Sequence, residues 1–326
     1  MVKIKDVAER AQVSPATVSN VLNGRSNVGE ETRQRVLEIC KELDYQPNLS
    51  GKSLKTGDNH TILFNFSDFD REFYLKIIQG ISDYAYSKDY DLLICTNKSS
   101  EKYMNKTFTS GCIMLDGKCS NSLLMRKSAE KYPMIILDRV IEAPYLKSLV
   151  IDNYSAQREL MEELIRAGYR KFAYISGVDG EDTQQRYRAF RDALDEHQIE
   201  FKRENYFSGD YREKSGYRIA KLLMLSENLP DILVCANDNM AIGAIKAFRA
   251  EGIRVPEDIS VCGFDDTEAA KMLELTTVTI PNYERGYLAA QYLLENIDGA
   301  ENYDTFRISA KVKWRKTTLR SIETKF

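Results

Sequence analysis

Short polar side chains between residues 14 and 20 could hydrogen-bond to the edges of DNA bases. Helical spacing places them on one face, opposite the apolar residues Val18, Val21 and Leu22. This outward face consists of Pro15, Ala16, Thr17, Ser19 and Asn20, whose side chains are short and mostly polar. A short helix with a buried back and a small, uncharged front fits the major groove, where side chains must reach base edges without crowding.

Two short helices joined by a tight turn would hold this face in position. The first helix has an apolar stripe at helical spacing, made of Ile4, Val7, Ala8 and Ala11. Ser14 is a suitable N-cap for the second helix, and Pro15 takes its first position, where a missing N–H costs nothing. Asn23-Gly24 ends that helix, and a third helix over 30–43 completes a small core. From spacing alone, a helical hairpin without a nucleic-acid role is an equally good interpretation.

Elsewhere the chain offers few groups for catalysis. Asp265-Asp266 follows the apolar segment 260–264 and could act as an acid/base pair, or could bind a ligand at the end of a parallel strand. The segment SGVDG (176–180) is glycine-rich but matches neither GxGxxG nor GxxxxGK[ST], which argues against a nucleotide-binding loop. Neither a Ser/His/Asp nor a Cys/His arrangement is evident, so we expect no enzyme activity.

Composition narrows the class of protein. The six cysteines form no CxxC pair and most lie in apolar runs, which indicates reduced, buried thiols. With only two histidines, His60 and His197, we expect neither a metal site nor a cofactor. There is no run of 18 apolar residues and no apolar leader at the N-terminus, so we expect a cytoplasmic protein without a membrane span.

Charge is distributed unevenly along the chain. The formal net charge of −3 argues against nucleic acid as a partner of the whole protein. Residues 1–57, however, hold nine Lys/Arg and seven Asp/Glu, whereas the remaining 269 residues hold 37 and 42. A mildly basic head on an acidic body fits DNA binding through one end only. Phosphate contacts would come from backbone N–H groups at helix starts and from Lys3, Arg25, Lys52 and Lys55.

From residue 61 onward, short apolar segments alternate with amphipathic ones. This pattern predicts strands and helices of parallel, doubly wound sheets. About 260 residues are too many for one core, so we expect two such sheets. The predicted strands are 61–66, 91–95, 112–115, 134–137, 148–151, 171–175, one near 206, 232–236 and 260–264. The main predicted helices are 70–88, 155–167, 184–197, 213–225 and 239–251.

The segment KIKDVAERAQVSPATVSNVLNG resembles the N-terminus of the lac repressor (LacI/GalR) family of bacterial transcription regulators. Further matching stretches are AGYRKFAYISG (167–177), CANDNMAIGAIKAFRAEGIRVPEDISVCGFDD (235–266) and LTTVTIPNYERG (275–286). The resemblance implies a three-helix helix-turn-helix head over 1–47, a hinge over 48–59, and a two-lobed periplasmic-binding-protein-like core over 60–326. It places the crossings between the lobes near residues 153, 280 and 310.

The same resemblance implies how DNA is bound. A homodimer would place two heads on a near-palindromic operator, and a hinge leucine, here Leu54, would wedge into the minor groove. The implied DNA contacts are Ser14, Pro15, Ala16, Thr17, Ser19, Asn20, Asn23, Arg25, Leu54 and Lys55. Two departures stand out: many relatives have Arg where this chain has Asn20, which pairs best with adenine, and most have Ala where it has Gly51.

By resemblance, a small-molecule effector would bind between the lobes at strand ends. The implied contacts are Ser67, Asp68, Phe73, Tyr74, Arg186, Tyr211, Asn237 and Asp265. Carboxylate, guanidinium and aromatic groups together suit a sugar or a sugar derivative. The alternative is that Phe73 and Tyr74 belong to the core and Asp266 caps a loop. A further departure is the segment 96–110, which is shorter than in the family and leaves a stunted helix.

Together, these expectations describe a repressor whose affinity for its operator is set by a small molecule. The same architecture could instead work with a corepressor, such as a purine or a sugar phosphate, or act as an activator. Two other classes share the core fold. A solute-binding transport protein would need a signal peptide and no DNA-binding head, and a nucleotide-dependent enzyme would need a phosphate loop or a catalytic group.

Overall fold

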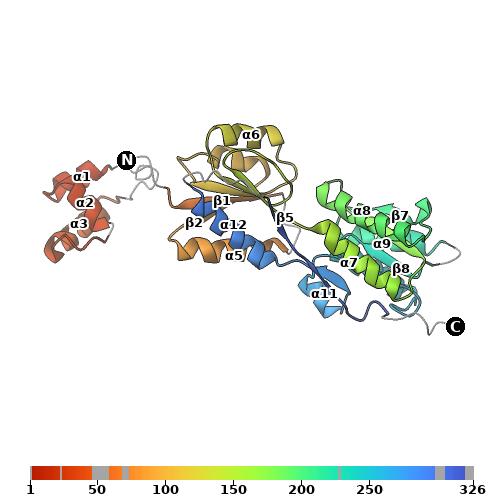
Figure 1. The fold of residues 1–326 in the computed structure, drawn as a ribbon. Helices are drawn as coiled ribbons and strands as arrows, with labels where there is room; N and C mark the ends of the chain where they lie inside the picture. Colours follow the sequence, from red (N-terminus) through yellow and green to blue (C-terminus); the bar gives the residue numbers. More distant parts are fainter. Residues whose placement is uncertain are drawn as a thin grey trace. The chain divides into compact units, whose positions relative to one another are not determined.

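The structure is a computed structural model of the 326-residue chain that describes residues 2–22, 24–45, 59–67, 73–226, 229–297 and 305–319. The chain forms two compact units, Met1–Asp58 and Asn59–Phe326. Each unit has its own hydrophobic core, and each is described by itself below (Figure 1).

The first unit contains three helices, α1 (Ile4–Arg10), α2 (Pro15–Leu22) and α3 (Glu30–Glu42). Their inward residues form one small cluster of Val7, Ala8, Ala11, Val18, Val21, Val36 and Cys40. This cluster contains the apolar stripes predicted from helical spacing. The boundaries follow from local chemistry, because the Ser14 hydroxyl accepts the Thr17 N–H at 3.1 Å and Gly24 takes a left-handed φ of 67° after α2.

The second unit begins with a six-stranded parallel sheet that forms the first lobe. The strand order is β11-β5-β4-β3-β1-β2. The strands are β1 (Thr61–Phe66), β2 (Asp91–Thr96), β3 (Gly111–Leu115), β4 (Met134–Ile136), β5 (Leu146–Ile151) and β11 (Phe306–Ile308).

Alternation of side chains along these strands builds a separate core on each face of the sheet. Ile62 and Phe64 of β1 pack with α5 (Phe73–Ser87) and α12 (Asn282–Glu295). Leu63 of the same strand faces the other way, toward the 3₁₀ helix η1 (Asn97–Tyr103) and α6 (Asn121–Ala129). Helices therefore cover both faces, as a doubly wound sheet requires.

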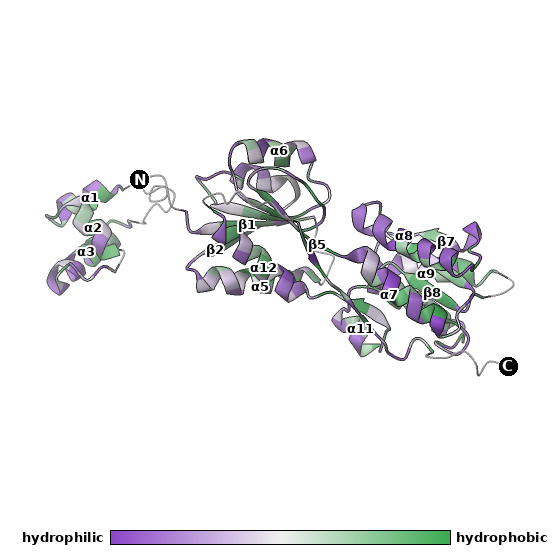
Figure 2. Ribbon diagram, in the orientation of Figure 1, coloured by the Kyte–Doolittle hydropathy of each residue, from purple (hydrophilic) through white to green (hydrophobic). Residues whose placement is uncertain are grey.

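The second lobe is built around a four-stranded parallel sheet of order β7-β6-β8-β9. Its strands are β6 (Phe172–Ser176), β7 (Tyr206–Ser208), β8 (Ile232–Cys235) and β9 (Ser260–Cys262). Its helices are α7 (Asn153–Arg166), α8 (Glu181–Glu196), η2 (Arg203–Asn205), α9 (Glu213–Leu223), α10 (Asp238–Ala250) and α11 (Glu268–Met272). Figure 2 shows the contrast between the hydrophobic strand β8 and the mainly hydrophilic helix α8.

The chain passes between the lobes three times. It leaves the first sheet after β5 and enters the second lobe with α7. It returns after β10 (Thr277–Thr279), because α12 packs on the first sheet. Finally β11 joins the first sheet beside β5, and β12 (Lys311–Lys313) pairs antiparallel with β10.

The C-terminal segment 305–319 completes both lobes. After β11 and β12, the Thr317 carbonyl accepts the N–H of Val261 at 2.9 Å. The Leu319 N–H then donates to the hydroxyl of Tyr169 at 2.7 Å. The end of the described chain is thus hydrogen-bonded into the second lobe, after it has supplied an edge strand to the first.

Glycines allow two pairs of helices to cross closely, one pair in each lobe. A Cβ on Gly80 of α5 would lie 2.1 Å from the Tyr283 carbonyl oxygen, and one on Gly286 of α12 would lie 2.1 Å from that of Ile77. In the second lobe, Gly216 of α9 meets α10 in the same way. No side chain larger than hydrogen fits at these crossings, so the glycines fix the distances between helices.

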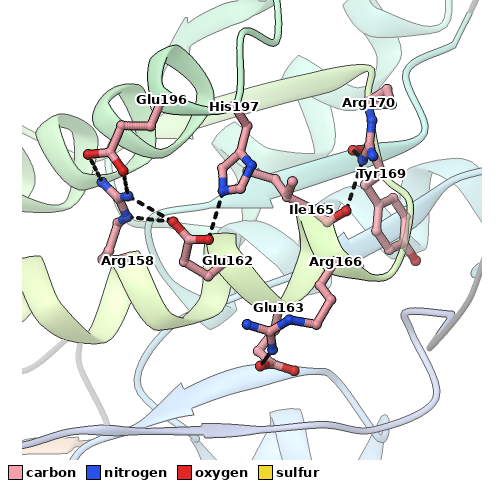
Figure 3. A network of polar contacts seen from close by, with 9 residues as sticks. All are labelled: Arg158, Glu162, Glu163, Ile165, Arg166, Tyr169, Arg170, Glu196 and His197. Atoms are coloured by element: carbon pink, nitrogen blue, oxygen red, sulfur yellow. Dashed lines mark hydrogen bonds and ion pairs between the residues drawn. The ribbon is translucent and has the colours of Figure 1, made fainter.

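Helices α7 and α8 are also joined by a network of ion pairs (Figure 3). Arg158 of α7 pairs with Glu196 at the end of α8 and with Glu162 on its own helix. The other oxygen of Glu162 lies 2.8 Å from Nε2 of His197. Because these groups are partly exposed, each pair contributes little to stability.

The observed elements differ from the predicted ones mostly at their ends. The helix predicted over 184–197 starts at Glu181, because the acidic first turn belongs to the helix. The shortened segment 96–110 contains η1 instead of an α-helix. The antiparallel pair β10–β12 joins segments more than 30 residues apart, which local periodicity does not predict. Among the described residues, no helix is long and apolar enough to cross a membrane.

Candidate functional site

The predicted DNA-reading face lies on α2 of the first unit. Ser14, Pro15 and Ala16 are exposed, and Thr17, Ser19 and Asn20 are partly exposed. The back of the helix is closed, because Val18 and Val21 are buried. Ser14 and Thr17 also have a structural task, since their hydroxyls lie 2.9 Å apart and Ser14 caps the helix. Arg25 is exposed, while Asn23, Gly51, Leu54 and Lys55 lie outside the described residues.

The second unit contains a cavity of about 570 Å³ lined by both lobes. It lies where strands end: Ser67 follows β1, Asn237 follows β8 and Asp265 follows β9. This is the position where open parallel sheets bind ligands. The cavity brings together Ser67, Phe73, Tyr74, Arg186, Tyr211, Asn237 and Asp265. The eighth predicted contact, Asp68, lies outside the described residues.

Arg186 lies on the inner face of α8 and is only 5% exposed. Its Nε donates to the side-chain oxygen of Asn153 at 2.8 Å, and its Nη1 donates to the carbonyl of Ala236 at 2.6 Å. The guanidinium lies over the ring of Phe264, 3.6 Å from its centroid. These contacts fix the plane of the fork, so Arg186 is preorganised toward the cavity.

Asn237 and Tyr211 support one another in the second lobe. The oxygen of Asn237 accepts the Met240 N–H at 3.0 Å and caps α10, and its amide donates to the Tyr211 carbonyl at 3.0 Å. Tyr211 has a left-handed φ of 66°, and its ring occupies the space that a Cβ on Gly177 would need. Its hydroxyl bonds to that of Thr183. Both side chains line the cavity, yet both are held by the protein itself.

Asp265 and Asp266 have different surroundings despite being neighbours. Asp265 lines the cavity and has an unusual φ of 115°. Its backbone N–H donates to the carbonyl of Val278 at 2.8 Å, which holds the backbone in this conformation. Such backbone strain is often found at ligand sites. Asp266 is not among the cavity residues and instead pairs with Arg315 at 2.6 Å. The alternative that Asp266 has a structural role is therefore the one the structure favours.

Phe73 and Tyr74 contribute to both core and cavity. Tyr74 is 4% exposed and packs against Phe66, with ring centroids 4.7 Å apart. Its hydroxyl lies 3.1 Å from that of Ser67, at the edge of the cavity. Phe73 is partly exposed and packs against Tyr74, with centroids 4.4 Å apart. An aromatic wall of this kind can cover the apolar side of a ligand ring.

Several polar residues of the cavity wall were not predicted from the sequence, among them four of the first lobe: Asp138, Arg139, Asn282 and Arg285. Each has a buried side-chain atom without a hydrogen-bond partner among the described residues. Burial raises the pKa of Asp138 to about 6, although Arg139 pairs with it at 3.0 Å.

A sequence signal for two of these residues existed. Arg285 is four and eight residues before Ala289 and Leu293, so helical spacing puts it on the buried face of α12. Asp138 directly follows an apolar strand, as Asp265 does. Charged residues are rarely buried, so a charged residue at a position where helical spacing predicts a buried side chain indicates a candidate site.

Asp238 is a buried carboxylate close to the cavity but outside its lining. It is fully buried and accepts hydrogen bonds from the Thr267 N–H at 2.8 Å and from the Thr277 hydroxyl at 2.5 Å. Burial, reinforced by the charge of Asp265, raises the pKa of Asp238 to about 8. Asp238 thus links the start of α10 to the segment that crosses between the lobes. No group of three metal-ligating side chains occurs in the part of the chain that the structure describes.

Comparison with known protein families gives two matches. Residues 3–48 match the model described as "Bacterial regulatory proteins, lacI family". Residues 161–318 match a "Periplasmic binding protein-like domain". The first match contains the face of α2, and the second contains the second-lobe wall of the cavity.

Whole-chain comparisons agree with these matches. A protein of Bacillus subtilis (strain 168) described as "Probable HTH-type transcriptional repressor ExuR" is 33% identical over 311 residues, covering 92% of this chain and 93% of its own. A solved structure of the lac repressor dimer bound to operator and the anti-inducer ONPF is 26% identical, with a TM-score of 0.83, and covers 98% of this chain and 99% of its own. A complex of the transcriptional regulator CelR with cellobiose is 26% identical, with a TM-score of 0.70, and covers 97% and 100%.

Proposed function

Because this chain belongs to the lacI family of bacterial regulatory proteins, we propose that it is a sequence-specific repressor whose operator affinity is controlled by a small molecule. The observation that carries the proposal is the presence, in one chain, of an exposed polar helix face on α2 and a polar cavity between two lobes. The first feature can read DNA, and the second can bind an effector. A repressor of this kind acts in the cytoplasm.

On DNA, α2 enters the major groove and its polar face contacts base edges. One head offers too few contacts for tight specific binding, so the functional unit is a homodimer on a near-palindromic site. The lac repressor structure, a dimer bound to operator, supports this arrangement by similarity. Asn20 of each head pairs with an adenine through N6 and N7. The exposed Arg25 is available for a phosphate.

In the cavity, Asp265 accepts hydrogen bonds from two hydroxyls of the effector while Arg186 donates to a fixed oxygen. Phe73 and Tyr74 cover the apolar side of the ring. The effector is therefore a sugar or a sugar derivative. The complex of CelR with cellobiose supports this class by similarity.

Selection from a library of random double-stranded DNA tests the DNA-binding function. We expect a near-palindromic sequence to be enriched, and fluorescence anisotropy on that sequence to give nanomolar affinity. The variant Asn20→Ala should lose about ten-fold to a hundred-fold in affinity and relax specificity at one base pair of each half-site. Lys106→Ala, a change in the second unit, serves as the control. Failure to enrich any sequence would reject the proposal.

Light scattering tests the oligomeric state on the same preparation. We expect a dimer of about twice the 37.4 kDa chain mass at micromolar concentration. A species of one chain mass would contradict the dimer.

Effector control is tested by adding sugars, nucleobases and their phosphates to the operator complex. Release of DNA identifies an inducer, whereas tighter binding identifies a corepressor.

A further inference from the structure

Two arginines are buried in the wall of the cavity without an acidic partner. Arg285 is 4% exposed and Arg186 is 5% exposed. Neither forms an ion pair in the described part of the chain; their hydrogen bonds go to backbone carbonyls and to the Asn153 amide oxygen. A buried guanidinium without a counter-ion is costly, and proteins usually pair such charges.

Of the two arginines, Arg285 has fewer hydrogen-bond partners. Its Nη2 donates to the carbonyl of Leu137, whereas its Nε is buried and has no partner among the described residues. Burial lowers the pKa of the guanidinium from its ordinary value, and the charges of Asp182 and Asp138 offset this only in part. Beside it on the first turn of α12, the side-chain oxygen of Asn282 is also buried without a partner and lines the same cavity.

No carboxylate of the cavity forms an ion pair with Arg285 or Arg186 in the described part of the chain, although the charges of Asp182 and Asp138 act on Arg285 from a greater distance. Asp138 pairs with Arg139 at 3.0 Å, and Asp182 accepts the Asn153 amide at 3.1 Å. Asp179 and Glu181 are exposed at the start of α8. The remaining acid, Asp265, follows β9 in the second lobe, whereas Arg285 lies on α12 against the first sheet.

We propose that the effector is a polyhydroxylated carboxylate, that is, a sugar acid, whose carboxylate pairs with Arg285 while Asp265 and Arg186 bind its hydroxyls. The proposal refines the effector class and rests on the function proposed above. A carboxylate matches the planar fork of a guanidinium and would give Arg285 the anionic partner that it lacks. The unpartnered oxygen of Asn282 can accept from a neighbouring hydroxyl of the same ligand.

A single-charge carboxylate fits this cavity better than a phosphate. Several helices begin at the cavity, including α8, α10, α11 and α12, and α8 lines it with two acids of its first turn, Glu181 and Asp182. These acids oppose a doubly charged group at a place where a helix dipole would otherwise attract it. The structure therefore assigns the anion to the α12 side of the cavity.

Calorimetry and thermal shift on the full-length chain test the assignment without DNA. The ligands are glucuronate, galacturonate and gluconate, with glucose, galactose and glucose 6-phosphate for comparison. We expect at least one acid to raise the melting temperature and to bind at least ten-fold more tightly than the neutral sugars. Binding of no acid, or tighter binding of a neutral sugar or of the phosphate, would overturn the proposal.

Variants separate recognition of the carboxylate from recognition of the hydroxyls. Arg285→Met should weaken the acid by about ten-fold to a hundred-fold. Because the change also removes the donor to the Leu137 carbonyl, affinities are compared at a temperature at which both unliganded chains are folded. Arg254→Gln removes an exposed guanidinium outside the cavity and should leave acid binding unchanged. Acid binding that survives Arg285→Met with unchanged affinity would refute the role of Arg285.

The outcomes for the two proposals are distinguishable. If a selected operator binds but no sugar acid does, the repressor function stands and the effector assignment fails. If sugar acids bind with the expected dependence on Arg285 but no DNA sequence is enriched, the cavity assignment stands and the repressor function fails.

Discussion

The two walls of the effector cavity are built differently. On the second-lobe wall, Arg186, Tyr211 and Asn237 have hydrogen-bond partners supplied by the protein. On the first-lobe wall, Asp138 and Arg285 each keep a buried polar atom without a partner among the described residues. The second-lobe wall is thus preorganised, whereas the first-lobe wall can gain bonds when a ligand arrives. Binding energy that comes from satisfying the first-lobe wall would favour the ligand-bound arrangement of the lobes.

The largest effect that this comparison predicts is on unliganded stability when Arg186 is removed. Arg186→Met would leave the Ala236 carbonyl and the Asn153 oxygen without their donor, and each such loss costs about 1–3 kcal/mol. We expect the free energy of unfolding of the second unit to fall by about 2–6 kcal/mol, measured by urea denaturation of the full-length chain. Arg285→Met, on the other wall, is the matched control and should cost about half as much, because it leaves only the Leu137 carbonyl without its donor. Equal losses would mean that the walls do not differ.

A second prediction concerns pH and Asp138. Its pKa of about 6 in the folded chain lies above the ordinary value of 3.8, so the folded state binds more protons between those values. The contribution of Asp138 to stability should therefore fall as pH rises from about 4 to about 6 and then level off, by at most about 3 kcal/mol. Asp238, whose pKa is raised to about 8, adds a slope of its own that continues to higher pH. Asp138→Asn should remove only the Asp138 part of the fall between pH 4 and 6, as followed by thermal unfolding of both chains across that range. An identical pH profile in the variant would show that burial does not raise the pKa of Asp138.

The third prediction concerns backbone strain at Asp265. Glycine adopts a φ of 115° without strain, so Asp265→Gly should raise stability by about 1 kcal/mol while abolishing effector binding. Asp265→Asn should keep the strain and still weaken the effector at least ten-fold, because the charge-assisted bonds are lost. Thermal unfolding and calorimetry of both variants check these expectations. If the glycine variant is less stable than the asparagine variant, Asp265 is not under strain.

The smallest effect belongs to Asn237. Asn237→Ala removes the cap of α10 and the bond to Tyr211, and should cost about 1 kcal/mol in the absence of ligand. Asn237→Ser keeps a capping oxygen and should recover about half of that loss in the same denaturation experiment. A loss seen only when effector is present would place Asn237 with the ligand-dependent wall instead.

The sequence predicted the second-lobe wall better than the first-lobe wall, for a physical reason. Asn237 and Asp265 come two and three residues after the apolar strands β8 and β9, and strand ends meet at one edge of a parallel sheet, so local patterns are sufficient to place them. Arg285 reaches the cavity only because α12 returns to the first lobe some 130 residues after β5. That return is a long-range event, which periodicity within one helix does not show.

Fold class and most elements followed from alternation of apolar segments and from resemblance to the family. The ends of the elements were harder to predict. The first turn of α8 contains the acidic residues Glu181 and Asp182, and a search for apolar periodicity assigns such residues to a loop. The resemblance implied a C-terminal strand over 311–314, which corresponds to β12, but its pairing with β10 was not predicted because the two strands have three residues each and join distant segments. The left-handed conformation of Tyr211 has no signal in its residue type.

The position of segment 305–319 has a consequence for synthesis on the ribosome. The three-helix head needs only the first 45 or so residues and can fold as soon as they emerge. Neither lobe has all its strands until β11 and β12 have emerged, because these strands lie at 306–313 of the 326 residues. A nascent or prematurely terminated chain therefore exposes a DNA-reading head on an unfinished core. Such a chain should be a good substrate for proteases, which would prevent heads without effector control from occupying operators.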